Sequence, residues 1–221
     1  MKRMIQGFVV AGALAVSGGA MAADKAGTAD VKGFVVPADA KGMLERLHYA
    51  NQDEIKQGQL AQQVSQNPDV KMFAEQMVRQ HTDADQKVQA LAQTKKLKLA
   101  DMPKPLNDAE KKCLAADKAT MEKLKALKGE AFDGAYLSAQ LGAHDDVLGK
   151  LAAGKQAAAG DAELSALVDE LSQSVAQHRQ HVYALLGKLS PQGAGAAMAP
   201  TMGGTTGAPA APAPAPAQPK K

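Results

Sequence analysis

Between Pro37 and Leu189 the apolar residues recur at spacings of three and four positions, not two. This period is typical of amphipathic helices that bury one face. Residues that end or start helices divide the stretch: Asn67-Pro68, a connector that contains Pro103 and Pro105, and Gly129. The sequence therefore predicts helices over about 38–66, 68–96, 107–127 and 130–153 or slightly beyond, and a fifth that starts at the Gly160-Asp161 cap and ends near residue 189.

Four of these helices are long, and the charged one over about 107–127 lies between the second and the third long helix. The pattern predicts an all-α domain, a four-helix bundle with one additional helix in its middle connection. That helix would span roughly 30 Å, so it either crosses along the bundle or lies across it.

The first 22 residues have the three parts of a secretory signal peptide. Lys2 and Arg3 supply the positive start, a short apolar run covers residues 8–16, and Ala20-Met21-Ala22 supplies the cleavage site. The run is too short for a permanent span, so the mature chain is expected to have no transmembrane segment. We expect an exported protein of the periplasm, with outer-membrane association or secretion as alternatives. Residues 23–37 are expected to form a flexible segment ahead of a helical domain at 38–190.

From Pro191 the composition changes abruptly to Ala, Pro and Gly, with a final run of alternating Ala and Pro. Such a stretch buries too little apolar surface to offset its ordering entropy, so residues 191–221 are predicted to be disordered. Two interpretations stay open: an ordinary disordered tail, or a spacer that reaches an envelope protein or a cell-wall partner.

Charge and cysteine content narrow the function classes. Loss of Lys2 and Arg3 with the signal peptide lowers the formal net charge from +3 to +1. Because no basic stripe is interleaved with aromatic residues, nucleic acid is not an expected partner. The single cysteine, Cys113, excludes an intramolecular disulfide. It lies on an apolar stripe, which predicts a buried thiol, with an intermolecular disulfide as the alternative.

Polar residues interrupt the apolar stripe of every long helix. Near the middle of the four long helices the interrupting residues are, in chain order, Glu54, His81, His144 and His178. Counted from the turns that join the helices, all four lie near the middle of the bundle, within about one helical turn of a common depth. Asp133 is a second interruption on the fourth predicted helix, and His181 lies at the border of the stripe on the fifth.

A buried carboxylate and buried imidazoles need partners for their polar atoms. Four of them at one depth therefore form either a closed hydrogen-bonded network or a metal site, and both interpretations stay open. Imidazole and carboxylate ligands suit transition metals, which makes Zn, Cu or Fe the candidate cofactor.

Three segments carry a family resemblance: Glu54-Ile-Lys-Gln-Gly-Gln-Leu-Ala61, Asn67-Pro-Asp-Val-Lys-Met-Phe-Ala-Glu-Gln-Met-Val-Arg-Gln-His81, and Phe132-Asp-Gly-Ala-Tyr136 followed by His144. A looser match leads from residues 163–167 to His178. With these residues the chain resembles, over about 38–189, a bacterial family catalogued as domain of unknown function 4142.

The resemblance implies a ferritin-like bundle in an exported protein of no established activity, a family sometimes labelled as outer-membrane. The family pattern carries over to six residues, namely Glu54, His81, Asp133, Tyr136, His144 and His178, whereas His181 is an addition of this chain. We therefore take Glu54, His81, His144 and His178 as the candidate metal ligands, with Asp133, Tyr136 and His181 as secondary candidates.

Two functions remain as hypotheses. The first is an envelope protein that binds a transition metal through the inward Glu and His residues. The second is a non-catalytic structural, stress or interaction protein of the periplasm whose buried layer is purely structural. An enzyme is the least favoured class, because the sequence has no glycine-rich phosphate loop with a Mg²⁺-binding Ser or Thr and no paired Glu-x-x-His motif.

Overall fold

The computed structural model describes residues 28–31 and 34–189, which form five helices and two short strands. The helices are α1 (Ala40–Val64), α2 (Pro68–Thr94), α3 (Asp108–Ala126), α4 (Gly129–Ala157) and α5 (Ala162–Leu189). The prediction of an all-α bundle domain is confirmed, and the predicted helix ends lie within a few residues of the observed ones. The predicted signal peptide at 1–22 and the predicted disordered tail at 191–221 lie outside the described residues.

Side-chain caps explain why the helix starts were readable in the sequence. The Asn67 side chain accepts hydrogen bonds from the backbone N–H groups of Asp69 (2.9 Å) and Val70 (3.4 Å), directly ahead of Pro68 at the first helical position. Asp39, Asn107 and Asp161 cap α1, α3 and α5 in the same way. The turn before α4 uses Gly129 at a φ of 59°, a conformation that favours glycine.

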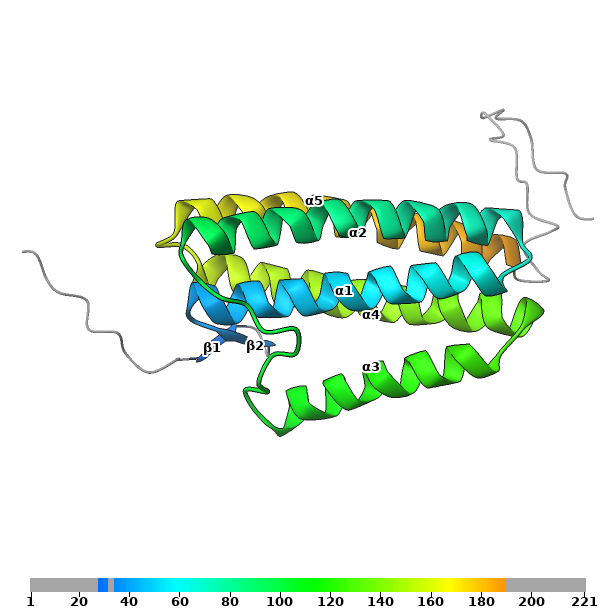
Figure 1. The fold of residues 1–221 in the computed structure, drawn as a ribbon, viewed down its shortest axis with the longest axis horizontal. Coiled ribbons are helices and arrows are strands. Elements are labelled where there is room, and N and C mark those ends of the chain that lie inside the picture. The colour runs from blue at the N-terminus through cyan, green and yellow to red at the C-terminus, as the bar shows by residue number, and fades with distance from the viewer. Residues whose placement is uncertain (1–27, 32–33, 190–221) are drawn as a thin grey trace, which may run out of the picture.

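The long helices pack as two antiparallel pairs, α1 with α2 and α4 with α5 (Figure 1). α3 runs along the bundle from the end where α2 finishes to the end where α4 begins. The additional helix is therefore a crossover along the bundle and does not lie across it. As a result α4 runs in the same direction as α2, and the middles of all four long helices meet at one depth.

Two apolar clusters fill the bundle, one toward each end. The first contains Met43, Val88, Leu151 and Leu164, and the second contains Ala61, Phe73, Phe132 and Val182, so each draws on all four long helices. Buried polar side chains lie between them, namely Asn51, Glu54, Gln57, His81, Gln140, His144 and His178. The core is thus interrupted at mid-length by a polar layer.

None of the described helices combines the length and the apolar content that a membrane-spanning helix requires.

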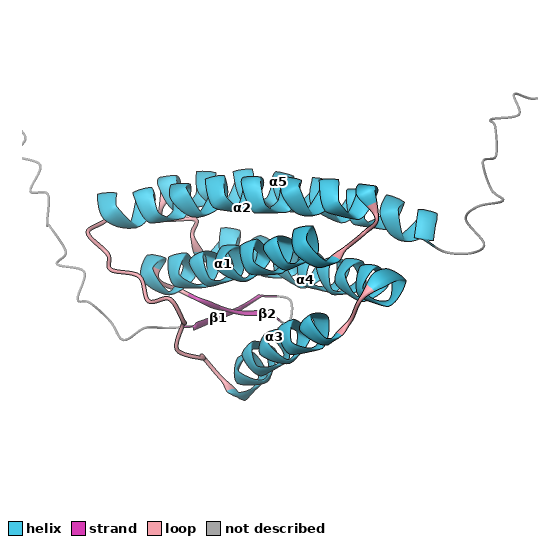
Figure 2. Ribbon diagram, turned by 45° about the vertical axis from the view of Figure 1, so that its right-hand side comes forward, coloured by secondary structure: helices cyan, strands magenta, loops and turns pink. Residues whose placement is uncertain are grey.

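The segment at 23–37, predicted to be flexible, instead contains a β-hairpin. Strand β1 (Thr28–Val31) pairs antiparallel with β2 (Phe34–Pro37), and Thr28 lies opposite Pro37. Figure 2 shows the hairpin beneath α1 and α4, on the side of the bundle where α3 lies. A lone two-stranded hairpin is marginal in water, so its stability depends on packing against α4, a contact that local sequence cannot reveal.

A glycine in α4 makes room for the hairpin. A Cβ atom at Gly149 would collide with the ring of Phe34, whereas one at Gly142, also in α4, would meet nothing within 4 Å. We therefore expect Gly149→Ala to lower the free energy of unfolding by about 1–3 kcal/mol through overpacking. Gly142→Ala is the matched control and is expected to raise it by about 0.5–1 kcal/mol. Urea unfolding measures both, and equal stabilisation by the two changes would contradict the packing of Phe34 on α4.

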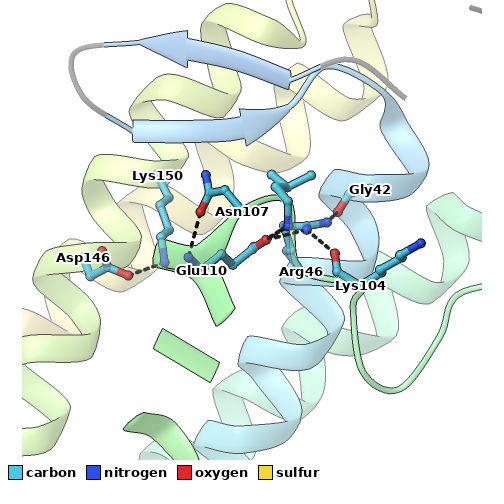
Figure 3. A network of polar contacts seen from close by, with 8 residues as sticks. Gly42, Arg46, Lys104, Asn107, Glu110, Asp146 and Lys150 are labelled. Atoms are coloured by element: carbon cyan, nitrogen blue, oxygen red, sulfur yellow. Dashed lines mark hydrogen bonds and ion pairs between the residues drawn. The ribbon is translucent and has the colours of Figure 1, made fainter. Parts of the chain in front are cut away.

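α3 is held to the bundle mainly through polar contacts. Only Leu124 of this helix is buried, whereas the Arg46 guanidinium of α1 makes a bidentate ion pair with Glu110 of α3 at 2.6 and 2.8 Å (Figure 3). Arg46 also donates to the carbonyls of Gly42 (3.0 Å) and Lys104 (2.9 Å). The prediction that Cys113 is buried is wrong, because α3 covers the bundle loosely and leaves this thiol exposed.

Candidate metal centre

Three imidazoles meet inside the polar layer. His81 of α2, His144 of α4 and His178 of α5 are 7%, 2% and 2% exposed. One ring nitrogen of each lies within 4.8 Å of a ring nitrogen of each of the others. The ring centroids are 5.2–5.9 Å apart. The prediction that these histidines share one depth is confirmed, and the structure adds that their side chains converge on one point.

Each imidazole is oriented by an oxygen on the outer side of this group, which we call the His triad (His81, His144 and His178). His81 Nδ1 lies 2.9 Å from Asn51 Oδ1. His144 Nδ1 lies 2.7 Å from the backbone oxygen of Gln140, and His178 Nε2 lies 2.6 Å from Gln80 Oε1. Carbonyl oxygens only accept hydrogen bonds, so in each contact the ring nitrogen must be the donor.

This arrangement determines which nitrogens face one another. A neutral imidazole carries one proton, and each ring uses it on the outer side, so the three inner nitrogens carry lone pairs. His144 Nε2 and His178 Nδ1 are 3.3 Å apart. His81 Nε2 is buried and has no hydrogen-bond partner among the described residues. Three lone pairs that point at each other repel, unless a cation lies between them.

The surroundings keep the triad neutral. Burial, together with the neighbouring His144 and His181, lowers the pKa of His178 to about 4. Burial, together with His178 and His144, lowers the pKa of His81 well below its usual value. Burial also lowers the pKa of His144, against the hydrogen bond to the Gln140 carbonyl. Protons are therefore poor candidates for the missing positive charge at neutral pH.

The residues fit a transition metal ion. Nitrogens bound at roughly 2.0–2.1 Å to one transition metal ion are roughly 2.8–3.4 Å apart, from square-planar to tetrahedral geometry, and the 3.3 Å between His144 and His178 lies within this range. The third nitrogen, from His81, lies within 4.8 Å of the other two, so a shift of its ring toward them would complete such a set. The outer N–H bonds to Asn51, Gln140 and Gln80 are the contacts that orient metal-bound histidines in proteins.

Glu54 lies beside the triad and is joined to it through one residue. Its Oε2 accepts a hydrogen bond of 2.6 Å from the Gln140 side chain, and the backbone oxygen of Gln140 holds His144. The pKa of Glu54 is raised to about 8: burial raises it most, the hydrogen bond from Gln140 lowers it, and the charges of Asp53 and Asp117 raise it further. The group whose ligand atoms lie within 4.8 Å contains the three histidines without Glu54.

The secondary candidates lie outside the triad. Asp133 and Tyr136 are buried nearer the start of α4, and neither Asp133 Oδ1 nor the Tyr136 hydroxyl finds a hydrogen-bond partner within the described part of the chain. Burial and the Glu54 charge raise the pKa of Tyr136 well above its usual value. His181 is half-buried with its ring edge-on to Phe73 at 5.1 Å, in the apolar cluster at that end.

Sequence reasoning missed the residues that orient the triad. Gln140 stands four positions before His144 and therefore on the same face of α4, a signal that a helical wheel contains. Asn51 lies three positions before Glu54 on the same helix, and Gln80 precedes His81 directly. The partner of His144 is a backbone carbonyl oxygen. Because every residue has one, the sequence does not identify which residue provides it.

A small cavity adjoins the triad. It has a volume of about 50 Å³, and apolar side chains from all four long helices share its wall with His81, His144 and His178. This is enough room for a water molecule beside a three-nitrogen site.

The fold is similar to two solved structures of low sequence identity. The structure of CopM in the Cu(II)-bound form superposes with a TM-score of 0.54 and 13% identity, over 68% of this chain and 97% of that one. A DUF305 protein from Streptomyces coelicolor, described as secreted, also superposes with a TM-score of 0.54 and 13% identity, over 69% of this chain and 93% of that one. At this identity both similarities concern the fold alone.

No curated protein sequence matches the chain significantly. Residues 35–185 match a family described as "Domain of unknown function (DUF4142)", and this range contains the His triad, its orienting partners and Glu54. The resemblance seen in the sequence is thereby confirmed over all four long helices: the chain belongs to the DUF4142 family.

Proposed function

We propose that this protein is an exported, non-catalytic copper-binding bundle that holds one copper ion between His81, His144 and His178. The fold in this proposal is ferritin-like, two antiparallel helix pairs joined by one long crossover. Export is supported by the signal peptide predicted at residues 1–22 and by the secreted description of the DUF305 protein of similar fold.

The observation that supports the proposal is that one nitrogen of each ring faces the other two in a buried layer, while the hydrogen bonds on the outer side use the proton of each ring. A purely structural network would use its inner nitrogens in hydrogen bonds, yet His81 Nε2 has no partner among the residues described. Leaving such a buried atom unsatisfied costs about 1–3 kcal/mol, and a bound metal ion would remove that cost.

Copper is favoured among the candidate metals for two reasons. Sites built from imidazole bind Cu²⁺ more tightly than the other divalent first-row metals, including Zn²⁺. The CopM structure of similar fold is a Cu(II)-bound form. Bound copper would supply the positive charge that the triad lacks, while Asn51, Gln80 and the Gln140 carbonyl keep the three rings in their ligand orientation.

The test is the metal content of the mature protein, purified without a histidine tag. After removal of metal, titration with Cu(II) against a chromophoric chelator is expected to show one tight equivalent, and the electron paramagnetic resonance spectrum is expected to show coupling to nitrogen. A protein that takes up no stoichiometric copper, or copper without nitrogen coupling, would contradict the proposal. A strict preference for zinc over copper would contradict the choice of metal.

A further inference from the structure

A second and larger cavity lies between the bundle and the elements that cover it. It has a volume of about 180 Å³ and is lined by residues of α1, α3, α4, α5 and β2 and by Pro103. Its outer side is formed by α3, the helix that buries only Leu124. We call it the outer cavity and call the 50 Å³ cavity beside the His triad the inner cavity.

The two cavities share a wall that is one side chain thick. Six residues line both of them, namely Leu47, Ala50, Glu54, Ala143, Val147 and Leu151. Glu54 is the single ionisable residue of this wall and is 7% exposed. The alanines at 50 and 143 are the smallest residues of the wall, so it is thinnest on the faces of α1 and α4 that carry them.

The outer cavity carries an excess of negative charge. Besides the buried acid Glu54, four carboxylates line it, namely Asp53, Glu110, Asp117 and Asp146, against the two cationic side chains of Arg46 and Lys150. Both cations are already paired, Arg46 with Glu110 and Lys150 with Asp146 (Figure 3). Asp53 and Asp117 form no ion pair within the described ranges; Asp53 accepts from Gln57 at 2.6 Å, and Asp117 accepts from the Tyr49 hydroxyl at 3.4 Å.

These groups form a series from solvent to the triad. Asp53 and Asp117 are half-buried, Glu54 is buried behind them, and the His triad lies across the shared wall. The buried His81 Nε2, which has no hydrogen-bond partner in the described part of the chain, is the independent sign that this series ends at a cation site.

We infer that the outer cavity is the path by which the metal cation reaches the His triad, with Asp53 and Asp117 attracting the ion and Glu54 passing it through the shared wall. The inference rests on the proposed function, and it adds a role for α3, which forms the outer side of that path.

Neutralising Asp53 and Asp117 tests whether their charges attract the metal ion. The chain contains three Tyr and no Trp, so quenching of tyrosine fluorescence by Cu(II) can report uptake in a stopped-flow experiment. In a Cys113→Ser background that avoids thiol oxidation, Asp53→Asn with Asp117→Asn is expected to lower the association rate constant about tenfold at low ionic strength. The difference in association rate constant between the variant and its parent should become smaller in 0.5 M salt, because salt screens the charges.

The matched control is Glu75→Gln with Asp83→Asn. It removes the same charge from two exposed positions of α2 that line neither cavity. Its association rate constant is expected to stay within about twofold of the parent, since surface charges far from the path act only through the screened field of the whole protein.

Blocking the outer cavity tests the path itself. Cys113 is exposed, lines this cavity and is the one cysteine of the chain, so thiol reagents modify a single known place. A polyethylene glycol maleimide on Cys113 is expected to slow both copper uptake and copper loss at least about fivefold. Carbamidomethyl-labelled protein is the control with a small group, and the copper stoichiometry should stay at one in both.

The outcomes separate the two proposals. Wild-type protein that binds no copper overturns the proposed function and the path together. One equivalent of copper with rates that neither the Asp variants nor the bulky label change overturns the path and leaves the triad as the binding site.

Discussion

Replacing His144 by alanine is expected to abolish tight copper binding, with a loss of affinity of at least about a hundredfold. Loss of the orienting partners of a metal-bound histidine already costs 10–100-fold, so loss of a ligand should cost more. His144 also supplies one of the two inner nitrogens that are 3.3 Å apart. Competition with a chromophoric chelator measures the affinity, and circular dichroism checks that the variant folds.

His181→Ala is the matched control for this experiment. It removes an imidazole from the same bundle, but His181 packs edge-on against Phe73 and lies outside the triad. Its affinity for copper is expected to stay within about threefold of the wild type. Equal losses in His144→Ala and His181→Ala would show that copper binds to histidines nonspecifically.

Replacing Asn51 by leucine extends the same prediction to the orienting partners. Asn51 Oδ1 holds the His81 ring so that Nε2 faces the triad. Its loss is expected to weaken copper binding about tenfold, less than loss of a ligand, because the nitrogen is still present but no longer oriented. An affinity unchanged from the wild type would contradict the orienting role of this contact.

The stability of the metal-free protein is expected to fall steeply as the pH drops from 6.5 to about 4. An unfolded histidine binds a proton near pH 6.5, whereas burial holds the pKa of folded His178 at about 4. Between these values the unfolded chain binds more protons, so protonation favours unfolding. His178 alone should lower the free energy of unfolding by about 3 kcal/mol, and His81 and His144, whose pKa values are also lowered, act in the same direction.

Glu54 is expected to oppose this trend. Burial raises its pKa to about 8 from a usual value of 4.5, so the folded chain keeps a proton that the unfolded chain has lost. Its contribution is complete below about pH 4.5 and is lost as the pH rises through 8. Urea unfolding of Glu54→Gln across pH 4–8 removes this contribution, because glutamine does not titrate. A flat profile between pH 4 and 6.5 in that variant would contradict a buried neutral triad.

Most of the helical framework was readable from local sequence. The caps Asn67, Asn107 and Asp161 and the breaker Gly129 act within one helical turn, so their effect does not depend on the rest of the chain. The common depth of the triad also followed from counting along helices of known rise. Family membership over 35–185 agrees with the segments that carried the resemblance.

Several features depended on contacts between distant parts of the chain. The hairpin formed by β1 and β2 depends on its packing against α4, and the exposure of Cys113 follows from how loosely α3 covers the bundle. The depth of Glu54 was predicted, but its contact with Gln140, 86 positions away in sequence, was not.

The sequence by itself determined the helices, their polar interruptions and the depth of each, because periodicity and capping are local properties of the chain. Only the tertiary structure decided which nitrogens of His81, His144 and His178 face one another and that Glu54 stands in the wall between two cavities. The reason is physical: a helix sets the height of a side chain, whereas its direction and its hydrogen-bond partners depend on how four helices rotate against each other.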